Sequence, residues 1–409
     1  MITDLYPPFI GGSYKHVQML SQHLAEIGNE VVVVTVERNK PSSSRMEGKI
    51  KIIRLEGLFE KIPFIFKNRS VKHPPPIVDP LISKKLKHII LKEKPDILHC
   101  HGWILYSVLR LRRELGIPLV VTLHDCGYFC PKILLLKGNE ICDRPLTIQC
   151  IGCAEKAYGS IKSAFIYCSI KLGRKRLDSV DKFIAVSSFV QKAYSQHLKL
   201  SYKDIIVVPN FYKEEATKTE ASRLLPRDFI LFVGDLAPHK GVDLLIDSYS
   251  RLATGTKLVL IGKRDSKHSF VNTDRITVVE NASHEYVMNS YGNARFVIIP
   301  SRCPDSCPTV ALEAMSAGKA VVAANIGGLR DLVVGGKTGL LVHPNSPEEL
   351  AKAMQYLLDN PTVATEMGMR GRERFLEKYQ ADVVVKEIER IYSEVIAACT
   401  PTREPTSSH

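Results

Sequence analysis

The sequence lacks several features that define particular classes of protein. None of its 409 residues belongs to an apolar run of about 20 residues, which a membrane-spanning helix needs. The first residues have neither the basic start nor the apolar stretch of a secretory signal. With one tryptophan and no aromatic-rich strip, the chain offers little on which bases stack. We therefore expect a cytoplasmic protein that does not bind nucleic acid.

A disulfide scaffold is not expected either. Ten cysteines are few for a chain of this length, and in a reducing compartment they are expected to be thiols or metal ligands. Hydrophobic residues make up 45% and charged residues 24%, which is typical of a globular protein. The length is too great for one ordinary core and fits two domains.

Acidic residues are scarce in the N-terminal half. Residues 1–210 contain 32 Lys and Arg against 18 Asp and Glu, whereas the remaining residues contain 24 against 25. The whole formal net charge of +13 therefore comes from the N-terminal half. This asymmetry indicates an anionic partner there: a lipid surface, a phosphorylated acceptor or, least favoured, nucleic acid.

Two segments of this half, residues 81–92 and 156–176, interleave apolar residues with Lys and Arg. An interfacial helix on anionic lipid requires this pattern, although an ordinary solvated helix face also fits it. We expect a peripheral protein at the inner face of the membrane, acting on a lipid-linked acceptor or on a polymer made there.

Short β-branched runs alternate with helical patterns along the chain, which predicts βαβ units and parallel sheets. The expected strands fall into two series, one at 1–4, 30–37, 96–99, 118–123, 183–186 and 205–208, and one at 229–234, 257–262, 296–300 and 320–323. We therefore predict an α/β protein with an N-terminal domain at 1–210, a linker at 211–227, a C-terminal domain at 228–380, a helix at 381–398 that packs on the N-terminal domain, and a flexible tail at 399–409.

Three segments carry the chemistry of anion and sugar binding. Gly11 and Gly12 precede the first helix, where small residues let backbone amides approach an anion, although a Gly-Gly turn is common. Lys240 lies in a turn after a strand, where it reaches phosphate oxygens unless it is a solvated loop lysine. Asp305 and Glu313 flank a helix start and either accept hydrogen bonds from sugar hydroxyls or complement the helix dipole.

Together these segments resemble the retaining glycosyltransferases of family four, the glycogen-synthase-like group, whose fold is GT-B. The resemblance extends from residues 4–8 to 339–342 and beyond. It implies two Rossmann-like domains facing a central cleft, and transfer of a hexosyl group with retention from a UDP-, GDP- or ADP-sugar to a lipid-linked, polysaccharide or glycan acceptor of the cell envelope. It implies no cofactor for catalysis, because lysine and helix dipoles supply the positive field.

The resemblance also assigns roles to single residues. Lys240 neutralises the donor diphosphate, Glu313 holds the ribose, Asp305 contacts the transferred sugar, and His124 approaches that sugar. A lone histidine at a strand end is otherwise more often structural. The expected donor-binding residues are Gly11, Gly12, Gly234, Lys240, Cys307, Pro308, Thr309, Val310 and Glu313.

Two positions depart from the family pattern. Asp235 stands where an arginine is usual, which removes a diphosphate contact that Arg264 is placed to replace. Asp305 stands where glutamate is usual, which alters sugar preference. Two other classes remain open: a GT-B epimerase, which usually lacks the paired acids (a phosphorylase has no matching cofactor lysine here), and a catalytically silent sugar-nucleotide-binding protein.

Four cysteines form a cluster within an insertion at residues 126–153. Cys130, Cys142, Cys150 and Cys153 are separated by 11, 7 and 2 residues. Four thiolates suit a tetrahedral structural zinc ion, which rigidifies a loop poor in apolar residues. The alternatives are free thiols or, third, disulfides, and Cys126 is close enough in sequence to replace one ligand.

Overall fold

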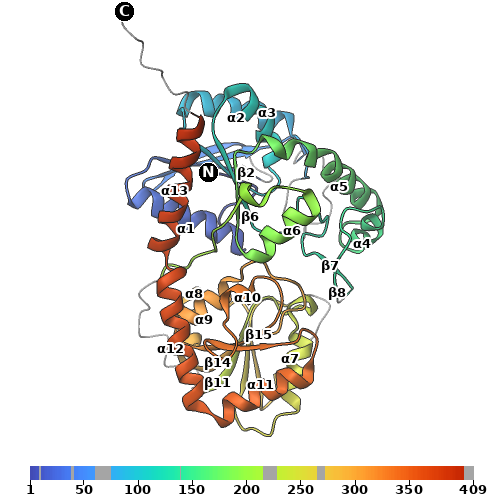
Figure 1. Cartoon of the computed structure of the whole chain (residues 1–409), viewed down its shortest axis with the longest axis vertical. Coiled ribbons are helices and arrows are strands. Elements are labelled where there is room, and N and C mark those ends of the chain that lie inside the picture. The colour runs from blue at the N-terminus through green and yellow to red at the C-terminus, as the bar shows by residue number, and fades with distance from the viewer. Residues whose placement is uncertain are drawn as a thin grey trace, which may run out of the picture.

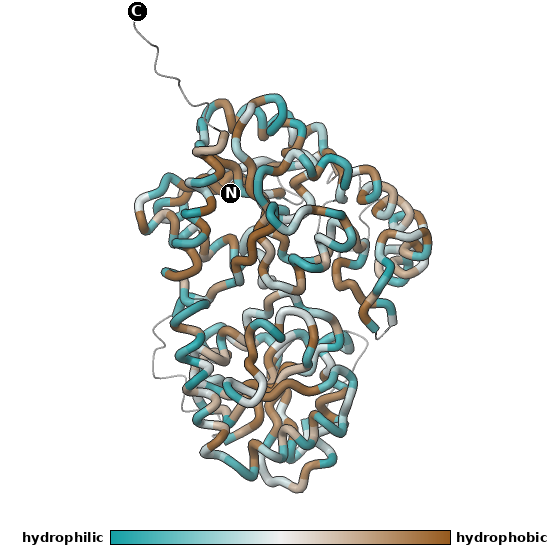
Figure 2. The backbone as a smooth tube through the Cα atoms, in the orientation of Figure 1, coloured by the Kyte–Doolittle hydropathy of each residue, from teal (hydrophilic) through white to brown (hydrophobic). Residues whose placement is uncertain are grey.

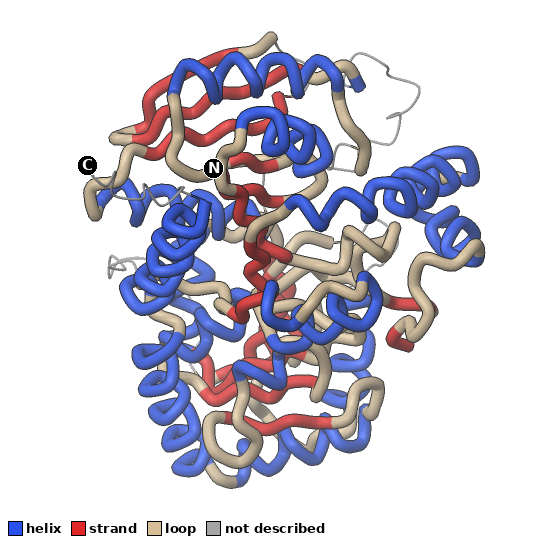
Figure 3. Tube along the Cα trace, turned by 45° about the horizontal axis from the view of Figure 1, so that its top comes forward, coloured by secondary structure: helices blue, strands red, loops and turns tan. Residues whose placement is uncertain are grey.

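The computed structural model of the chain describes residues 1–8, 11–37, 41–59, 75–138, 140–214, 228–264 and 272–399. It contains two stacked α/β units, each built on a parallel sheet (Figure 1). In Figure 3 the strands of each sheet run through the interior while the helices lie outside them. Apolar residues follow the strands and polar residues the outer helix faces (Figure 2).

The first sheet owes its order to buried, β-branched strands. The valine run of β2 (Val31–Glu37) pairs with β4 (Ile50–Glu56) in a parallel register along the whole length of both strands. The edge strand β3 (Ser43–Glu47) is polar, exposed and antiparallel, which protects the edge of the sheet from further pairing. The spatial order is β10 (Ile205–Val207), β9 (Lys182–Ala185), β6 (Leu119–Leu123), β5 (Leu98–His101), β1 (Ile2–Thr3), β2 (Val31–Glu37), β4 (Ile50–Glu56) and β3 (Ser43–Glu47).

The second sheet is parallel throughout. Its spatial order is β13 (Ile276–Val279), β12 (Leu258–Ile261), β11 (Phe229–Val233), β14 (Ala294–Ile299), β15 (Ala320–Ala324) and β16 (Gly339–Val342). In each sheet the order in which successive strands are added reverses at one point, between β1 and β5 in the first sheet and between β11 and β14 in the second. Ligands of such sheets bind at the carboxyl ends of the strands beside this reversal. Both α/β units therefore have a defined place for a ligand.

Helices connect the strands and cover the sheets. Those of the first unit are α1 (Gly12–Glu26), α2 (Pro80–Glu93), α3 (Leu105–Leu115) and α6 (Ser188–Leu198). Those of the second are α7 (Val242–Ser250), α8 (His284–Asn293), α9 (Thr309–Ser316), α10 (Leu329–Leu332), α11 (Pro347–Asp359) and α12 (Pro361–Lys378). In the part of the chain that the structure describes, no helix is long and apolar enough to cross a membrane.

Between β6 and β9 the chain makes an excursion from the first unit. It comprises a small hairpin of β7 (Leu136–Lys137) and β8 (Glu140–Ile141), followed by α4 (Gln149–Tyr158) and α5 (Ser160–Gly173). The two helices pack on each other and project from the side of the molecule (Figure 1). The expected insertion at 126–153 covers the hairpin and the start of α4.

The last helix, α13 (Ala381–Cys399), returns to the first unit. Its buried apolar residues join the core formed by α1 and the first sheet. The backbone N–H of Tyr212 donates to the carbonyl of Tyr379 at 3.1 Å, where the two crossings between the units lie side by side. Most of the expected linker (residues 215–227) and of the expected tail (residues 400–409) lie outside the described residues.

Candidate active site

The loops at the reversal of the second sheet meet through a glycine. Lys240 ends a short 3-10 turn, and Gly241 follows with φ 73°. A Cβ atom at Gly241 would lie 2.1 Å from the carbonyl oxygen of Pro300. Only glycine tolerates both the positive φ and this close approach. Gly241 therefore allows the turn after β11 to lie against the loop after β14.

This contact brings two expected site residues together. The Nζ atom of Lys240 lies 2.5 Å from Oδ1 of Asp305, and the hydroxyl of Ser301 donates to Oδ2 at 2.5 Å. Burial acts to lower the pKa of Lys240, but Asp305, Cys303 and Asp235 together outweigh burial and raise that pKa. Burial likewise opposes ionisation of Asp305, but Lys240, Ser301 and His239 together outweigh burial and keep the pKa of the carboxyl below its usual value. Both groups are therefore charged and paired.

Two adjacent glycines, Gly327 and Gly328, allow close packing against the loop that contains Asp305. Cβ atoms at Gly327 and Gly328 would lie 2.5 Å from the carbonyl oxygen of Asp305 and 1.9 Å from that of Ser306. The N–H of Gly328 donates to the Asp305 carbonyl at 2.7 Å. This pair was not predicted, although a Gly-Gly two residues after the strand β15 was a usable signal.

Glu313 lies buried in α9 and has two neighbours that the sequence analysis missed. The hydroxyl of Tyr291, from α8, donates to Oε2 of Glu313 at 2.9 Å. Burial, together with the Glu313 charge, raises the pKa of Tyr291 well above its ordinary value, so the phenol remains a donor. Lys15, from α1 of the first unit, places its Nζ atom 4.0 Å from Oε1. One oxygen of Glu313 is therefore fixed, and the other faces a cation across the two units.

The expected anion-binding amides surround the start of α9. Pro308 is the N-cap residue, Thr309 and Val310 form the first turn, and no acidic side chain lies in that turn. The carbonyl of Cys307 accepts a hydrogen bond from the Asn210 amide at 2.8 Å, which ties this helix start to the first unit. A helix N-terminus without its own acid favours a bound anion.

Gly234 directly follows β11, and Arg264 follows the neighbouring strand β12. Gly234 has φ 147°, and Leu236 forms an isolated parallel bridge with Arg264. The guanidinium of Arg264, however, lies 2.8 Å from a carboxylate oxygen of Glu280. Arg264 thus lies near Asp235, where the family usually has an arginine, but its guanidinium is paired with Glu280.

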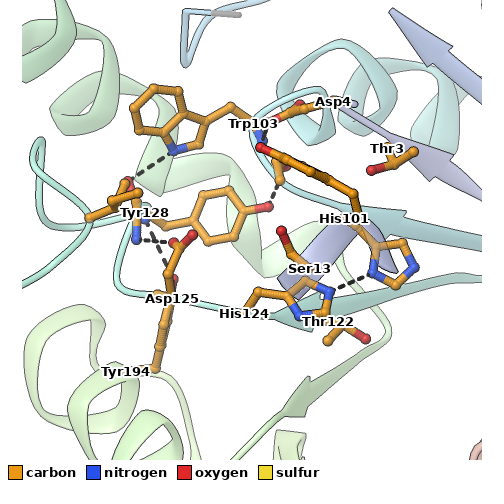
Figure 4. A pocket seen from close by; sticks show the side chains of 14 residues that line it. Thr3, Asp4, Ser13, His101, Trp103, Thr122, His124, Asp125, Tyr128 and Tyr194 are labelled. Atoms are coloured by element: carbon orange, nitrogen blue, oxygen red, sulfur yellow. Dashed lines mark hydrogen bonds between the residues drawn. The ribbon is translucent and has the colours of Figure 1, made fainter. Parts of the chain in front are cut away.

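The reversal of the first sheet contains His124, directly after β6. Figure 4 shows it in a pocket with Asp4, His101 and Tyr128. The cavity measures about 30 Å³, which holds water molecules but not a sugar ring. Asp4 accepts hydrogen bonds from the backbone N–H groups of Trp103 and Ile104 and so anchors the start of α3.

Helix α1 joins the two groups of expected residues. It begins at Gly12, after Gly11, and its first turns carry Lys15 toward Glu313 and His16 toward His124. The His16 and His124 rings lie 5.1 Å apart. His124 and Glu313 therefore lie near the same end of α1. No contact among the described residues joins His124 directly to Lys240 or Asp305.

The four cysteines of the insertion line one cavity of about 240 Å³ (Cys130, Cys142, Cys150 and Cys153). All four are free thiols, so the disulfide alternative does not occur in this structure. Burial raises the pKa of the Cys130 thiol to about 12. Across the described ranges, no three His, Cys, Asp or Glu side chains are grouped closely enough to hold a metal ion as they stand.

Comparison with known proteins gives a consistent result over the whole chain. The sequence model of Glycosyltransferase Family 4 matches residues 10–215, and that of Glycosyl transferases group 1 matches residues 214–374. An uncharacterized glycosyltransferase of Methanocaldococcus jannaschii is 27% identical over 403 residues, covering 97% of this chain and 98% of the relative. The glycogen synthase of Mycobacterium tuberculosis is 25% identical over 435 residues, covering 99% and 96%.

Solved structures show the same fold. Sucrose-phosphate synthase from Thermosynechococcus elongatus matches with a TM-score of 0.73 at 21% identity, covering 97% of this chain and 100% of the other. The Anabaena HepE protein in complex with UDP-glucose matches with a TM-score of 0.65 at 15% identity, covering 96% and 99%. The two-sheet architecture is thus GT-B, as predicted, and the chain belongs to glycosyltransferase family 4.

Proposed function

We propose that the protein is a retaining hexosyltransferase that moves a sugar from a UDP-, GDP- or ADP-sugar to a lipid-linked, polysaccharide or glycan acceptor of the cell envelope. The observation that carries this proposal is the grouping of Lys240, Asp305 and the start of α9 at the reversal of the second sheet. A diphosphate needs a cation and free amides, and a sugar needs carboxylate acceptors. HepE complexes contain UDP-glucose, and Arabidopsis Starch Synthase IV is bound to ADP, which supports a nucleotide-linked donor.

Each residue has a proposed task. Lys240, held charged by Asp305, neutralises the diphosphate together with the α9 amides. Glu313, fixed by Tyr291, accepts hydrogen bonds from the ribose hydroxyls. Asp305 contacts the transferred sugar, and His124 approaches it from the first unit. Catalysis needs no metal in this scheme, because Lys240 and the helix dipole stabilise the departing diphosphate.

The acceptor side is proposed to lie at an anionic membrane surface. Of the two basic segments, α2 buries Ile82, Leu86 and Ile90 in the core, and Leu91 is its one large apolar side chain that is described as exposed, so that helix has little left for lipid. The α4–α5 excursion differs, because Ile161 is 90% and Leu172 is 71% exposed beside exposed lysines and arginines. Exposed apolar side chains among basic residues suit the interface of an anionic bilayer.

We further propose a structural zinc ion at the four cysteines of the insertion. Four thiols around one cavity, two of them three residues apart on α4, supply the ligand number that zinc prefers. The hairpin β7–β8 has only two residues in each strand, so it gains most from such a cross-link. Metal binding requires the thiols to lose their protons and to close on the ion.

A thermal-shift assay against UDP-, GDP- and ADP-sugars, without added metal, tests the donor proposal. We expect one donor to raise the melting temperature of the wild type, because it binds only the folded state. Lys240→Ala is expected to lose this shift, whereas Lys352→Ala, at an exposed position on α11, retains it. If no nucleotide sugar shifts the wild type, or if Lys240→Ala responds like the wild type, the donor site is misplaced.

A further inference from the structure

A pair of hydrogen bonds joins the first unit to the second at the start of α6 (Figure 1). The backbone N–H of Ser188 donates to Oδ2 of Asp331 on α10 at 2.6 Å, and the Ser188 hydroxyl donates to Oδ1 at 2.6 Å. Ser188 is the first residue of α6, where a backbone N–H has no partner within the helix. The helix dipole also favours a carboxylate at this end. Asp331 therefore binds the start of α6 through both of its oxygens.

On the side of the first unit, this contact lies next to His124. The strands β6 and β9 are parallel neighbours, and Leu123 pairs with Ala185 at their carboxyl ends. His124 directly follows Leu123, and α6 begins three residues after Ala185. His124 and the start of α6 therefore leave the same edge of the sheet from adjacent strands.

On the side of the second unit, the contact lies next to the loop that contains Asp305. Asp331 comes three residues after Gly328, whose N–H donates to the Asp305 carbonyl at 2.7 Å. The carbonyl of Asp331 accepts hydrogen bonds from the guanidinium of Arg374 at 2.7 Å and from the hydroxyl of Tyr379 at 3.0 Å. The short helix α10 is thus fixed both to the Asp305 loop and to the end of α12.

The two units also approach each other closely at this point. A Cβ atom at Gly328 would lie 3.1 Å from the Cβ atom of Ser187, the N-cap residue of α6. His124 and Asp305, by contrast, have no direct contact among the described residues. Their relative position across the two units is therefore set indirectly, and the bonds between Ser188 and Asp331 are close in the chain to both.

We propose that Asp331 is a positioning residue: by binding the start of α6, it holds His124 in place relative to the Asp305 loop. It thereby aligns the two parts of the site that face the transferred sugar. This inference rests on the proposed function for its consequence in catalysis. The diphosphate and ribose are bound by Lys240, Glu313 and the α9 amides, which all belong to the second unit. Loss of Asp331 therefore impairs the transfer step more than it impairs donor binding.

The contact can be broken from either side. Ser188→Pro removes both donors, yet α6 still forms, because proline is well tolerated at the first position of a helix. Asp331→Ala removes both acceptors. Asp331→Asn keeps an oxygen for the Ser188 N–H and supplies an amide N–H to the Ser188 hydroxyl, so it retains the pair without the charge. Asp359→Ala, at an exposed position on α11, serves as the control.

Steady-state kinetics with the donor found by thermal shift give the first readout. We expect kcat to fall about tenfold in Ser188→Pro and in Asp331→Ala, with donor KM changed by less than about twofold. The double variant is expected to be no slower than either single variant, because both remove the same bonds. Asp331→Asn is expected to recover most of the lost kcat, and Asp359→Ala to match the wild type.

Small-angle X-ray scattering gives a second readout that needs no turnover. We expect Ser188→Pro and Asp331→Ala to have a larger radius of gyration than the wild type and Asp331→Asn, because the two units separate more freely. An unchanged radius of gyration in both variants would overturn the proposal, as would a rise in donor KM at unchanged kcat or additive losses in the double variant. If no donor supports turnover in the wild type, the scattering still decides whether Asp331 holds the units together, and the failure lies with the proposed function.

Discussion

Acid should destabilise the first unit through His16, and the magnitude follows from its surroundings. His16 is 2% exposed, and neither of its ring nitrogens has a partner among the described residues. Burial lowers its pKa from 6.5 to about 4. Because the folded pKa is depressed, the unfolded chain binds a proton at His16 between these values and the folded chain does not. Stability is therefore lost as pH falls below 6.5, down to about pH 4.

The shift to about 4 corresponds to roughly 3 kcal/mol in total, of which about 2 kcal/mol is lost between pH 7.5 and pH 5. His16→Phe removes the titrating group and leaves no unpaired polar atom. The remaining buried histidines still titrate, so the comparison between variant and wild type isolates His16.

Urea unfolding followed by tryptophan fluorescence measures the free energy of unfolding of the first α/β unit, because the single tryptophan, Trp103, is buried there. We expect the wild type to lose about 2 kcal/mol more than His16→Phe between the two pH values. His88→Gln, at an exposed position on α2, serves as the control and is expected to follow the wild type. Equal losses in wild type and His16→Phe would refute the reasoning.

Two further predictions concern the excursion from the first unit. The protein is expected to float with vesicles of phosphatidylcholine and phosphatidylglycerol at low salt. The double variant Ile161→Ser with Leu172→Ser is expected to bind these vesicles more weakly, whereas Leu91→Ser on α2 is expected to bind like the wild type. Absence of binding by the wild type rejects the membrane proposal. Elemental analysis of purified protein is expected to find one zinc ion per chain, and a chelator is expected to remove it and lower the melting temperature. The double variant Cys150→Ser with Cys153→Ser is expected to contain no zinc. A metal-free wild type in which all four thiols react with a thiol reagent rejects the zinc site.

Elements with strong local signals were predictable from sequence. The helix expected at 105–115 is α3, and the helix expected at 381–398 differs from α13 by one residue. The strand expected at 96–99 is instead Leu98–His101, because buried pairing with β6 outweighs the local apolar pattern. The edge strand β3 was missed because its residues are polar and its only partner is β4.

The candidate site was predictable in its members but not in its contacts. Lys240 and Asp305 lie 65 positions apart, and their pairing depends on the backbone approach of Gly241 to Pro300. Lys15 and Tyr291 were missed because a helix lysine and a helix tyrosine carry no local sign of a partner across the fold.

The return of α13 has a consequence for the order in which the protein is made. The core that contains Val17 and Leu20 of α1 also contains four apolar residues of α13: Val384, Val385, Ile388 and Ile391. Part of the core of the first unit is therefore supplied by the end of the chain. On the ribosome, the N-terminal sheet therefore emerges with an uncovered apolar face, and it keeps that face until the entire second unit has been synthesised. Truncation just before residue 381 should accordingly leave the first unit, not the second, as the aggregation-prone part.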